Sequence, residues 1–206
     1  TGLCAGVVSE MTSCELSQVS VGKWFNSANP QLARAEYEHE KVPSLQQVFS
    51  LVKAHLSAKR PVIYVEIKLK NNGVESAALA SSVADLIVGQ DLQNQVVVVS
   101  FNLKVLTEIK AVESSIRIGA LFEPKRSAVR MISGRSLIEA SLECGAEEIL
   151  LHRLMVSRRL VGLAEEKGLV PVVWTVDDPK WLSRAARLGI HALITNNPAG
   201  MILALS

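Results

Sequence analysis

The second half of the sequence repeats one pattern, in which a stretch with helical spacing of apolar residues ends in glycine and a short apolar run follows. The runs are residues 148–151, 170–174 and 191–195, and the glycines before them are Gly145, Gly168 and Gly189. Glycine just after a helix adopts the left-handed conformation that other residues resist. The runs are too short for helices and rich in Val, Ile and Leu, which is typical of strands buried on both faces. The pattern predicts consecutive strand–helix units.

Each of these runs is followed by a helix start signal. A side-chain acceptor at the cap, with proline at the first helical position, is a strong signature of a helix N-terminus. The signals are Ser157, Asp178-Pro179 and Asn197-Pro198.

The first half of the sequence shows the same alternation more weakly. Strand candidates are residues 62–69, 96–100 and 116–122, helix candidates are 45–55, 75–88 and 103–112, and Asn71-Asn72-Gly73 is expected to be a turn. Ser44 and Gln47 form a capping box for the first of these helices, and Asn102 caps the third. Because no linker rich in Pro, Gly and Ser follows residue 60, we expect one domain over residues 1–206. Within it, residues 1–41 are expected to be loops with a short helix, and 42–206 the strand–helix units.

Six strands that alternate with helices predict an α/β fold with a parallel sheet and right-handed crossovers. From the pattern alone, the strands could form an open doubly wound sheet or part of an eight-stranded barrel. Neither G-x-G-x-x-G nor G-x-x-x-x-G-K-[ST], the nucleotide-binding signals of open sheets, follows any of the strands. Their absence disfavours a nucleotide-binding sheet, and both architectures stay open at this point.

Composition narrows the class of protein. Hydrophobic residues make up 49% of the chain, which is enough to bury a sizeable core, and no apolar run approaches the ~20 residues of a membrane span. A formal net charge of +2 and 4% aromatic residues disfavour a nucleic-acid partner. The three cysteines show no C-x-x-C pair, which fits a reducing compartment, so a cytoplasmic location is favoured. The chain begins with Thr1 and not Met, so we expect its natural start to lie upstream, and export stays open.

Candidate chemistry is sought at the carboxyl ends of the strands, where parallel α/β folds bind their ligands. Glu66 and Lys68 are two residues apart on an apolar strand, so alternation places them on one face. Charges there must be paired, bound to a metal or solvated at an open end of the sheet, because burying them bare is costly. They could form an internal ion pair. Alternatively, Glu66 holds a hard divalent cation and Lys68 faces a phosphate oxygen.

Aromatic residues mark three other strand ends. Trp174, Phe101 and Phe122 could each be core residues or walls of a substrate pocket. His152, just past another strand end, is a conceivable acid or base, although a lone histidine there is more often a hydrogen-bonded structural group.

Five short motifs in order resemble the glycerophosphodiester phosphodiesterases, and the resemblance covers roughly residues 10–200. They are Lys41-Val42-Pro43-Ser44-Leu45-Gln46-Gln47-Val48, Val65-Glu66-Ile67-Lys68, Ser100-Phe101-Asn102, Trp174-Thr175-Val176 and Ile194-Thr195-Asn196-Asn197-Pro198. The family fold is a (β/α)8 TIM barrel, so the resemblance implies that this chain carries the last six of the eight strand–helix units.

The resemblance also implies an activity, the metal-dependent hydrolysis of a small-molecule glycerophosphodiester to glycerol 3-phosphate and an alcohol. It makes Glu66 a metal ligand, Lys68 a phosphate contact and Trp174 part of the substrate pocket. Calcium or magnesium suits an oxygen-ligand site of this kind. We add Phe101 and Phe122 to the expected pocket. The resemblance indicates no preferred headgroup and no oligomeric state.

The departures from the family pattern are as important as the matches. The family opens with a His-Arg-Gly strand, an E-x-D metal pair and a His-Asp pair, and none of these occurs in the sequence. Both catalytic histidines of the family would then lie upstream of Thr1, and Asn196 stands where many relatives carry aspartate. We therefore expect a fragment of a complete enzyme, since six barrel strands leave two edges unpaired. Because the catalytic histidines are missing from it, we expect the fragment to be inactive alone. The alternatives are a catalytically dead relative that binds a phosphodiester or a partner chain, and an unrelated α/β protein with a structural Glu66–Lys68 pair.

Overall fold

The computed structural model describes residues 6–55, 61–69, 75–124 and 133–205. The chain divides into two compact units, Thr1–Lys59 and Arg60–Ser206. The division between the units falls at residues 59/60, whereas the sequence pattern placed the boundary between the loop region and the strand–helix units at residues 41/42. That the chain is a single domain stays a prediction. No helix in the described part is long and apolar enough to cross a membrane.

The first unit is more helical than its weak periodicity predicted. It contains α1 (Ser13–Leu16), α2 (Val21–Ala28), α3 (Leu45–Ala54) and the short 3-10 turns η1 (Val8–Glu10), η2 (Pro30–Leu32) and η3 (Ala35–His39). Capping explains these short helices. Thr12 and Glu15 form a capping box at α1, Ser20 accepts a hydrogen bond from the Lys23 amide at α2, and the predicted Ser44–Gln47 box opens α3. Such elements are too short to leave a readable hydrophobic period.

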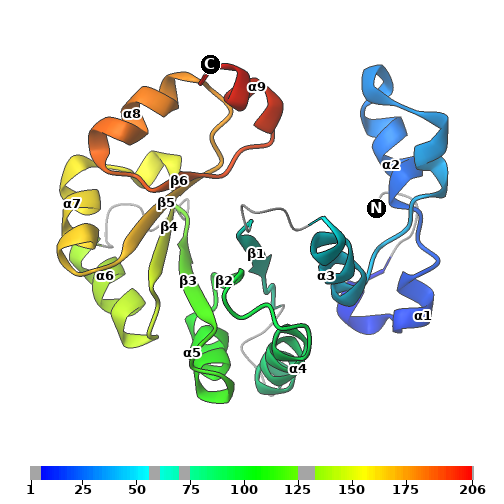
Figure 1. The fold of residues 1–206 in the computed structure, drawn as a ribbon, viewed down its shortest axis with the longest axis horizontal. Coiled ribbons are helices and arrows are strands. Elements are labelled where there is room, and N and C mark those ends of the chain that lie inside the picture. The colour runs from blue at the N-terminus through cyan, green and yellow to red at the C-terminus, as the bar shows by residue number, and fades with distance from the viewer. Residues whose placement is uncertain (1–5, 56–60, 70–74, 125–132, 206) are drawn as a thin grey trace. The chain divides into compact units, whose positions relative to one another are not determined.

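The second unit is built on a sheet of six parallel strands (Figure 1). They are β1 (Ile63–Glu66), β2 (Val96–Ser100), β3 (Arg117–Phe122), β4 (Glu148–His152), β5 (Val170–Trp174) and β6 (Ala192–Leu193). Their order across the sheet is their order along the chain. In a doubly wound sheet the order reverses at a switch point, whereas a barrel adds its strands consecutively. The sheet is therefore a curled part of a barrel, and the six predicted strands are confirmed. Strands β2 and β5 have their predicted bounds, β1, β3 and β6 are shorter than predicted, and β4 is one residue longer.

Helices connect the strands and lie on the outer side of the curled sheet (Figure 1). They are α4 (Glu75–Gly89), α5 (Leu103–Val112), α6 (Gly134–Glu143), the 3-10 turn η4 (Arg153–Met155), α7 (Arg158–Glu166), α8 (Lys180–Leu188) and α9 (Pro198–Leu203). The predicted caps Asn102, Ser157 and Asn197 are confirmed. At α8 the cap position is Pro179, and Asp178 accepts from the Lys180 amide. Gly145, Gly168 and Gly189 have φ angles of 78°, 77° and 78°, as expected of helix-ending glycines. The predicted turn at Asn71-Asn72-Gly73 lies outside the described residues.

Alternation along the strands creates two apolar layers. The inner layer consists of Val97, Val99, Leu121, Leu150 and Val172, with Tyr64, Trp174, Ala192 and Ile194 packed against it. The outer layer joins the sheet to α6, α7 and α8 and includes Ile149, Leu151, Val161, Val173 and Ala185. Gly119 makes room on the inner side, since a Cβ there would stand 2.5 Å from Leu150 Cδ1. These residues identify the inner face of each strand. By alternation, they also show which side chains at the carboxyl ends of the strands lie on that face.

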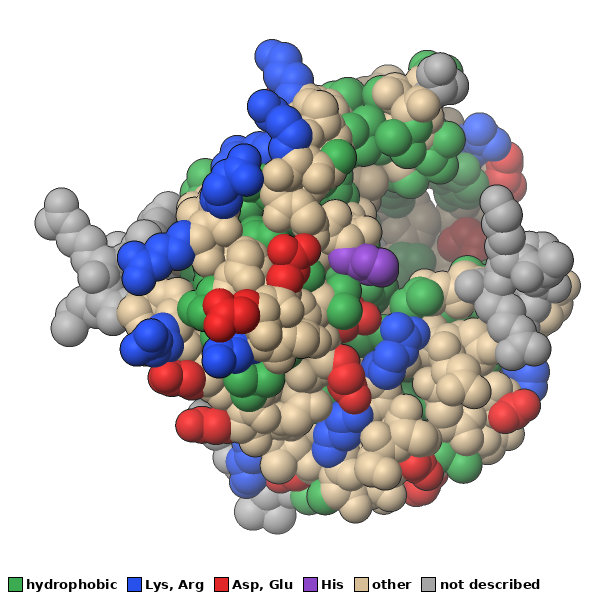
Figure 2. All heavy atoms as spheres, turned by 60° about the vertical axis from the view of Figure 1, so that its left-hand side comes forward, with side chains coloured by type: hydrophobic (Ala, Val, Ile, Leu, Met, Phe, Trp, Pro, Cys, Tyr) green, Lys and Arg blue, Asp and Glu red, His purple; other side chains and the backbone are tan. Residues whose placement is uncertain are grey.

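The outer surface of the helices is charged. Figure 2 shows lysine and arginine side chains next to acidic ones on the face that comes forward there, with apolar side chains between them. Charges of both signs are typical of a solvated helix face. That the protein has no nucleic-acid partner stays a prediction.

Candidate active site

The predicted ion pair lies at the carboxyl end of β1. Glu66 is the last residue of that strand, and Lys68 Nζ lies 3.4 Å from Glu66 Oε2. The Glu66 side chain is 34% exposed and that of Lys68 is 77% exposed. An exposed pair contributes about 0–1 kcal/mol to stability, so its charges remain available to a ligand. The pair is therefore not a buried salt bridge.

Ser100 explains why the motif Ser100-Phe101-Asn102 accompanies this ion pair. Its buried hydroxyl donates to the Ile67 carbonyl (2.7 Å) and accepts from the Asn102 amide (3.0 Å). The Ile67 amide in turn donates to the Val99 carbonyl (2.9 Å). These bonds hold the segment between Glu66 and Lys68 against the end of β2 and the start of α5.

An aromatic pair spans the inner face at the same end of the strands. The rings of Phe101 and Trp174 meet edge to face, with centroids 5.5 Å apart at 76°. Trp174 Nε1 donates to the Leu150 carbonyl (3.2 Å), which fixes the indole against β4. Phe101 follows β2 and Trp174 ends β5, so their contact crosses the inner side of the curled sheet. The structure thus brings together two of the three predicted pocket aromatics.

Phe122 does not join this pair. It packs against the outer apolar layer, whereas its neighbour Leu121 belongs to the inner one. Consecutive strand residues face opposite sides of a sheet, so a one-residue difference in position decides which face an aromatic reaches. Phe122 is therefore a packing residue between the sheet and the helices.

His152 lies beside Trp174 on the inner face. The two residues are register partners on β4 and β5, and their rings meet edge to face at 5.2 Å and 82°. His152 Nδ1 accepts a hydrogen bond from the Leu154 amide (3.3 Å) and so caps the short turn η4. The sequence alone allowed either a structural or a chemical role for His152. In the structure it both makes a hydrogen bond that caps η4 and lies beside Trp174 at the candidate site.

Asp177 is a residue of this region that the sequence patterns missed. Its carboxylate accepts hydrogen bonds from the Thr195 hydroxyl (2.8 Å), the Asn196 amide (2.7 Å) and the Asn196 side chain (3.2 Å). These donors, the Thr195 hydroxyl first, lower the pKa of Asp177. They join the loop after β5 to the loop after β6. In the sequence Asp177 directly precedes the helix start signal Asp178-Pro179, and no other pattern marks it.

Asn196→Asp is expected to weaken this contact, because the new carboxylate would face that of Asp177 and could not donate. Repulsion would raise the pKa of Asp177 above its present lowered value. Thermal unfolding should then show a small loss of stability near neutral pH that shrinks in high salt and at acidic pH. Asn196→Ala, which removes the donor without adding charge, is the control. Equal salt dependence in the two variants would contradict the explanation.

The carboxylates in this region do not complete a metal centre. Within the described ranges, no group of three or more His, Cys, Asp or Glu side chains lies close enough to hold a metal ion. Calcium takes about six to eight oxygen ligands, and magnesium takes about six, of which one or two are usually carboxylates and the others waters or substrate phosphates. Glu66 has the chemistry of a ligand but is a single one. The described residues therefore do not fit a self-contained divalent cation site.

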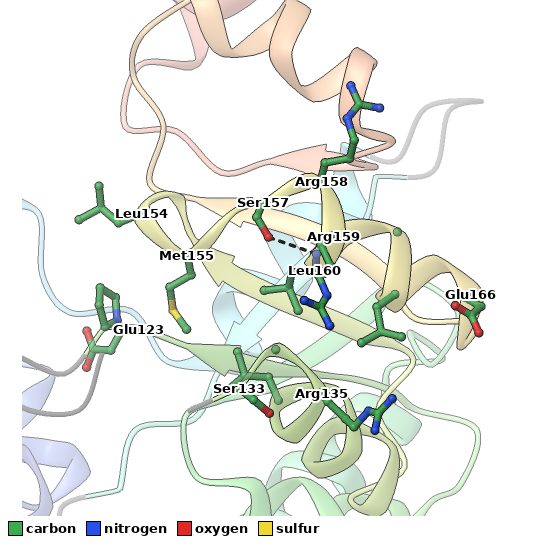
Figure 3. Close-up of a pocket in the computed structure, with 15 residues that line it drawn as sticks. Glu123, Ser133, Arg135, Leu154, Met155, Ser157, Arg158, Arg159, Leu160 and Glu166 are labelled. Carbon is green, nitrogen blue, oxygen red and sulfur yellow. Dashed lines mark hydrogen bonds between the residues drawn. The ribbon is translucent and has the colours of Figure 1, made fainter. Parts of the chain in front are cut away.

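A cavity of about 760 Å³ lies elsewhere, on the outer side of the sheet between α6 and α7. Figure 3 shows Ser133 and Ser157, which cap these two helices, on either side of it, with Arg135 and Arg159 nearby. Neither Glu66, Lys68, Phe101 nor Trp174 lines this cavity. It is a groove between helices and is separate from the candidate site.

The fold and site define a barrel-type α/β protein with charged and aromatic groups at the carboxyl ends of its strands. The chain belongs to the glycerophosphoryl diester phosphodiesterase family, whose model matches residues 2–200. The glycerophosphodiester phosphodiesterase of Bacillus subtilis strain 168 is 25% identical over 203 residues, which are 94% of this chain and 64% of the relative. That of Caldanaerobacter subterraneus is 24% identical over 204 residues, 96% of this chain and 72% of the relative. The chain thus spans just under two thirds of the Bacillus relative's length.

Solved structures agree on the fold. A Silicibacter pomeroyi protein assigned to the glycerophosphoryl diester phosphodiesterases superposes with a TM-score of 0.82 at 22% identity, over 98% of this chain and 71% of that protein. An Oleispira antarctica phosphodiesterase, solved in complex with its product sn-glycerol-3-phosphate, superposes with a TM-score of 0.76 at 18% identity, over 97% of this chain and 72% of that protein. The predicted TIM-barrel class, with six of its strand–helix units in this chain, is confirmed, and an unrelated α/β protein is excluded.

Proposed function

We propose that this chain carries the substrate-recognition part of a phosphodiesterase that hydrolyses glycerophosphodiesters to glycerol 3-phosphate and an alcohol. One observation supports the proposal most directly. In a member of this family, an accessible carboxylate–ammonium pair, Glu66 and Lys68, stands at the carboxyl end of β1, on the inner face that also carries Phe101 and Trp174.

Each group has a defined part in this proposal. Lys68 contacts the phosphate oxygens through its exposed ammonium, which a lysine carries on a flexible four-carbon stem. Glu66 offers one carboxylate oxygen to a divalent cation, calcium or magnesium, which when bound would stabilise charge on the phosphoryl oxygens. Phe101 and Trp174 form an apolar wall against which the carbon skeleton of the substrate packs. Because the described residues do not complete the cation site, we assign no catalytic step to the metal.

The 206-residue chain alone is proposed to bind without hydrolysing. It contains none of the His-Arg-Gly, E-x-D and His-Asp motifs that carry the family's acid, base and remaining metal ligands. A second function, that of a phosphodiester-binding module without catalysis, is favoured by the ion pair itself, since Lys68 already balances the charge of Glu66 without a metal.

Binding of glycerol 3-phosphate to the 206-residue chain tests the recognition proposal, with calorimetry as the measurement. Lys68→Ala is expected to weaken binding roughly tenfold, because a charge-assisted contact to phosphate is lost. Lys167→Ala is the matched control, since Lys167 is an exposed lysine at the end of α7, next to the amino end of β5. No binding by the unchanged chain, or equal loss in both variants, would contradict the proposal.

Two further measurements separate the enzyme from the binding module. Glu66→Gln should strengthen metal-free binding, because a negative charge beside the phosphate disappears, and should abolish any enhancement by calcium or magnesium. Joining the chain to a segment that supplies the family's His-Arg-Gly, E-x-D and His-Asp motifs should produce metal-dependent hydrolysis of glycerophosphocholine. Metal-independent binding together with an inactive chimera would favour the binding module. Hydrolysis by the 206-residue chain alone would show that its acid and base lie within it.

A further inference from the structure

His152 differs from the other groups at the candidate site because one of its ring nitrogens already accepts a hydrogen bond from the backbone. Nδ1 accepts from the Leu154 amide, and an N–H cannot accept from another N–H, so this bond requires Nδ1 without a proton. The neutral ring therefore carries its proton on Nε2. Nε2 makes no hydrogen bond within the described ranges of the chain. His152 thus presents a fixed donor, and the same bond disfavours its use as a base through Nε2.

The position of this donor follows from strand alternation. His152 is two residues beyond Leu150, which belongs to the inner apolar layer, so its side chain lies on the inner face. Its ring leans edge to face against Trp174, and Trp174 also meets Phe101 from β2. These two ring contacts run from the end of β2 to His152 on β4. Strand β2 is the neighbour of β1, whose end carries Glu66 and leads to Lys68.

We propose that His152 is a specificity-determining residue, whose Nε2–H donates a hydrogen bond to a hydroxyl oxygen of the glycerol moiety of the substrate. The proposal rests on the proposed function, in which Lys68 takes the phosphate. A ligand with its phosphate at Lys68 and its carbon skeleton along Phe101 and Trp174 presents its hydroxyl groups towards β4. A neutral donor suits a neutral hydroxyl acceptor, and it discriminates against a ligand that lacks one, because the donor is then left unpaired.

Two variants separate this role from the capping of η4. His152→Asn keeps an acceptor near the Nδ1 position for the Leu154 amide and removes the distal N–H. His152→Gln places an amide N–H near the position of Nε2 and gives up the cap. If His152 recognises the hydroxyl, the glutamine variant retains binding and the asparagine variant does not. If His152 is only a cap, the asparagine variant behaves like the unchanged chain.

Calorimetry of the 206-residue chain with three ligands, glycerol 3-phosphate, propyl phosphate and inorganic phosphate, completes the test. The unchanged chain should bind glycerol 3-phosphate about tenfold more tightly than propyl phosphate, which has no free hydroxyl. His152→Asn should remove this difference while leaving the affinities for propyl phosphate and inorganic phosphate unchanged, and His152→Gln should largely restore it. Equal binding of the two esters by the unchanged chain would overturn the inference and leave the proposed function intact. No binding of any of the three would instead contradict the proposed function.

Discussion

Tyr64→Phe is expected to destabilise the sheet-bearing unit by about 2 kcal/mol near neutral pH, because it removes a hydrogen bond to a buried carboxylate. The Tyr64 hydroxyl donates to Glu148 Oε2 (2.8 Å), and Arg117 Nη1 lies 3.7 Å from Glu148 Oε1. Glu148 is only 4% exposed. All three residues lie near the amino ends of β1, β3 and β4, at the opposite end of the inner face from the candidate site.

The pH dependence of this loss identifies its cause. Burial raises the pKa of Glu148 above 4.5, although Tyr64 and Arg117 act against the shift. A carboxyl group with a raised pKa contributes stability that is complete below its unfolded value and is lost as pH rises through its folded value. Removing the Tyr64 donor raises the pKa of Glu148 further and enlarges that loss. The cost of Tyr64→Phe should therefore be smallest in acid, where Glu148 is protonated in both proteins, and should grow as rising pH ionises this carboxyl group.

Urea unfolding of the two proteins at a series of pH values measures this difference. Tyr37→Phe is the matched control, because it removes the other tyrosine hydroxyl of the chain, for which the described residues provide no hydrogen-bond partner. It is expected to change the free energy of unfolding little at any pH. A cost of Tyr64→Phe that is the same at all pH values would mean that packing, and not the ionised carboxylate, determines it.

The strand–helix units could be predicted because their signals are local. A buried strand reads as a short apolar run, and a helix that ends in glycine marks where the next strand begins, as at Gly168 before β5. The choice between an open sheet and a barrel could not be made from these signals, because both use the same unit. It depends on which strands pair, and only the consecutive order from β1 to β6 settles it.

The part of the candidate site that could be predicted is the part where charged residues interrupt an apolar strand. Glu66 and Lys68 stood out because two charges on an apolar strand require a solvated end, a partner or a ligand. Phe122 was misplaced because an aromatic in a strand buried on both faces gives no indication of which face it occupies. Glu148 was missed for a related reason. The sequence shows it only as the first residue of an apolar run, and the residue that makes its burial tolerable, Tyr64, is distant in sequence.

Gly22→Ala is expected to destabilise the first unit by roughly 3 kcal/mol, because there is no room for a side chain at this position of α2. A Cβ on Gly22 would stand 1.4 Å from the carbonyl oxygen of Tyr37, which is backbone and cannot rotate aside. The contact cannot open cheaply, since the Val21 amide donates to the Glu40 carbonyl (3.0 Å) and the Ser20 hydroxyl to the Glu38 carbonyl (3.0 Å). Phe25 and Tyr37 also pack edge to face across it at 5.8 Å. Adding one methyl group must therefore separate α2 from η3.

Hydrogen exchange resolved by segment is the appropriate measurement, because it reports on α2 and η3 separately from the larger sheet-bearing unit. Gly162→Ala is the control: Gly162 lies within α7, a Cβ there would have no neighbour within 4 Å, and alanine favours helix over glycine by about 1 kcal/mol. We expect faster exchange at residues 20–40 in the Gly22 variant and slower or unchanged exchange along α7 in the control. Unchanged protection at residues 20–40 would mean that α2 can move away from Tyr37 at little cost, and that the close approach does not stabilise the first unit.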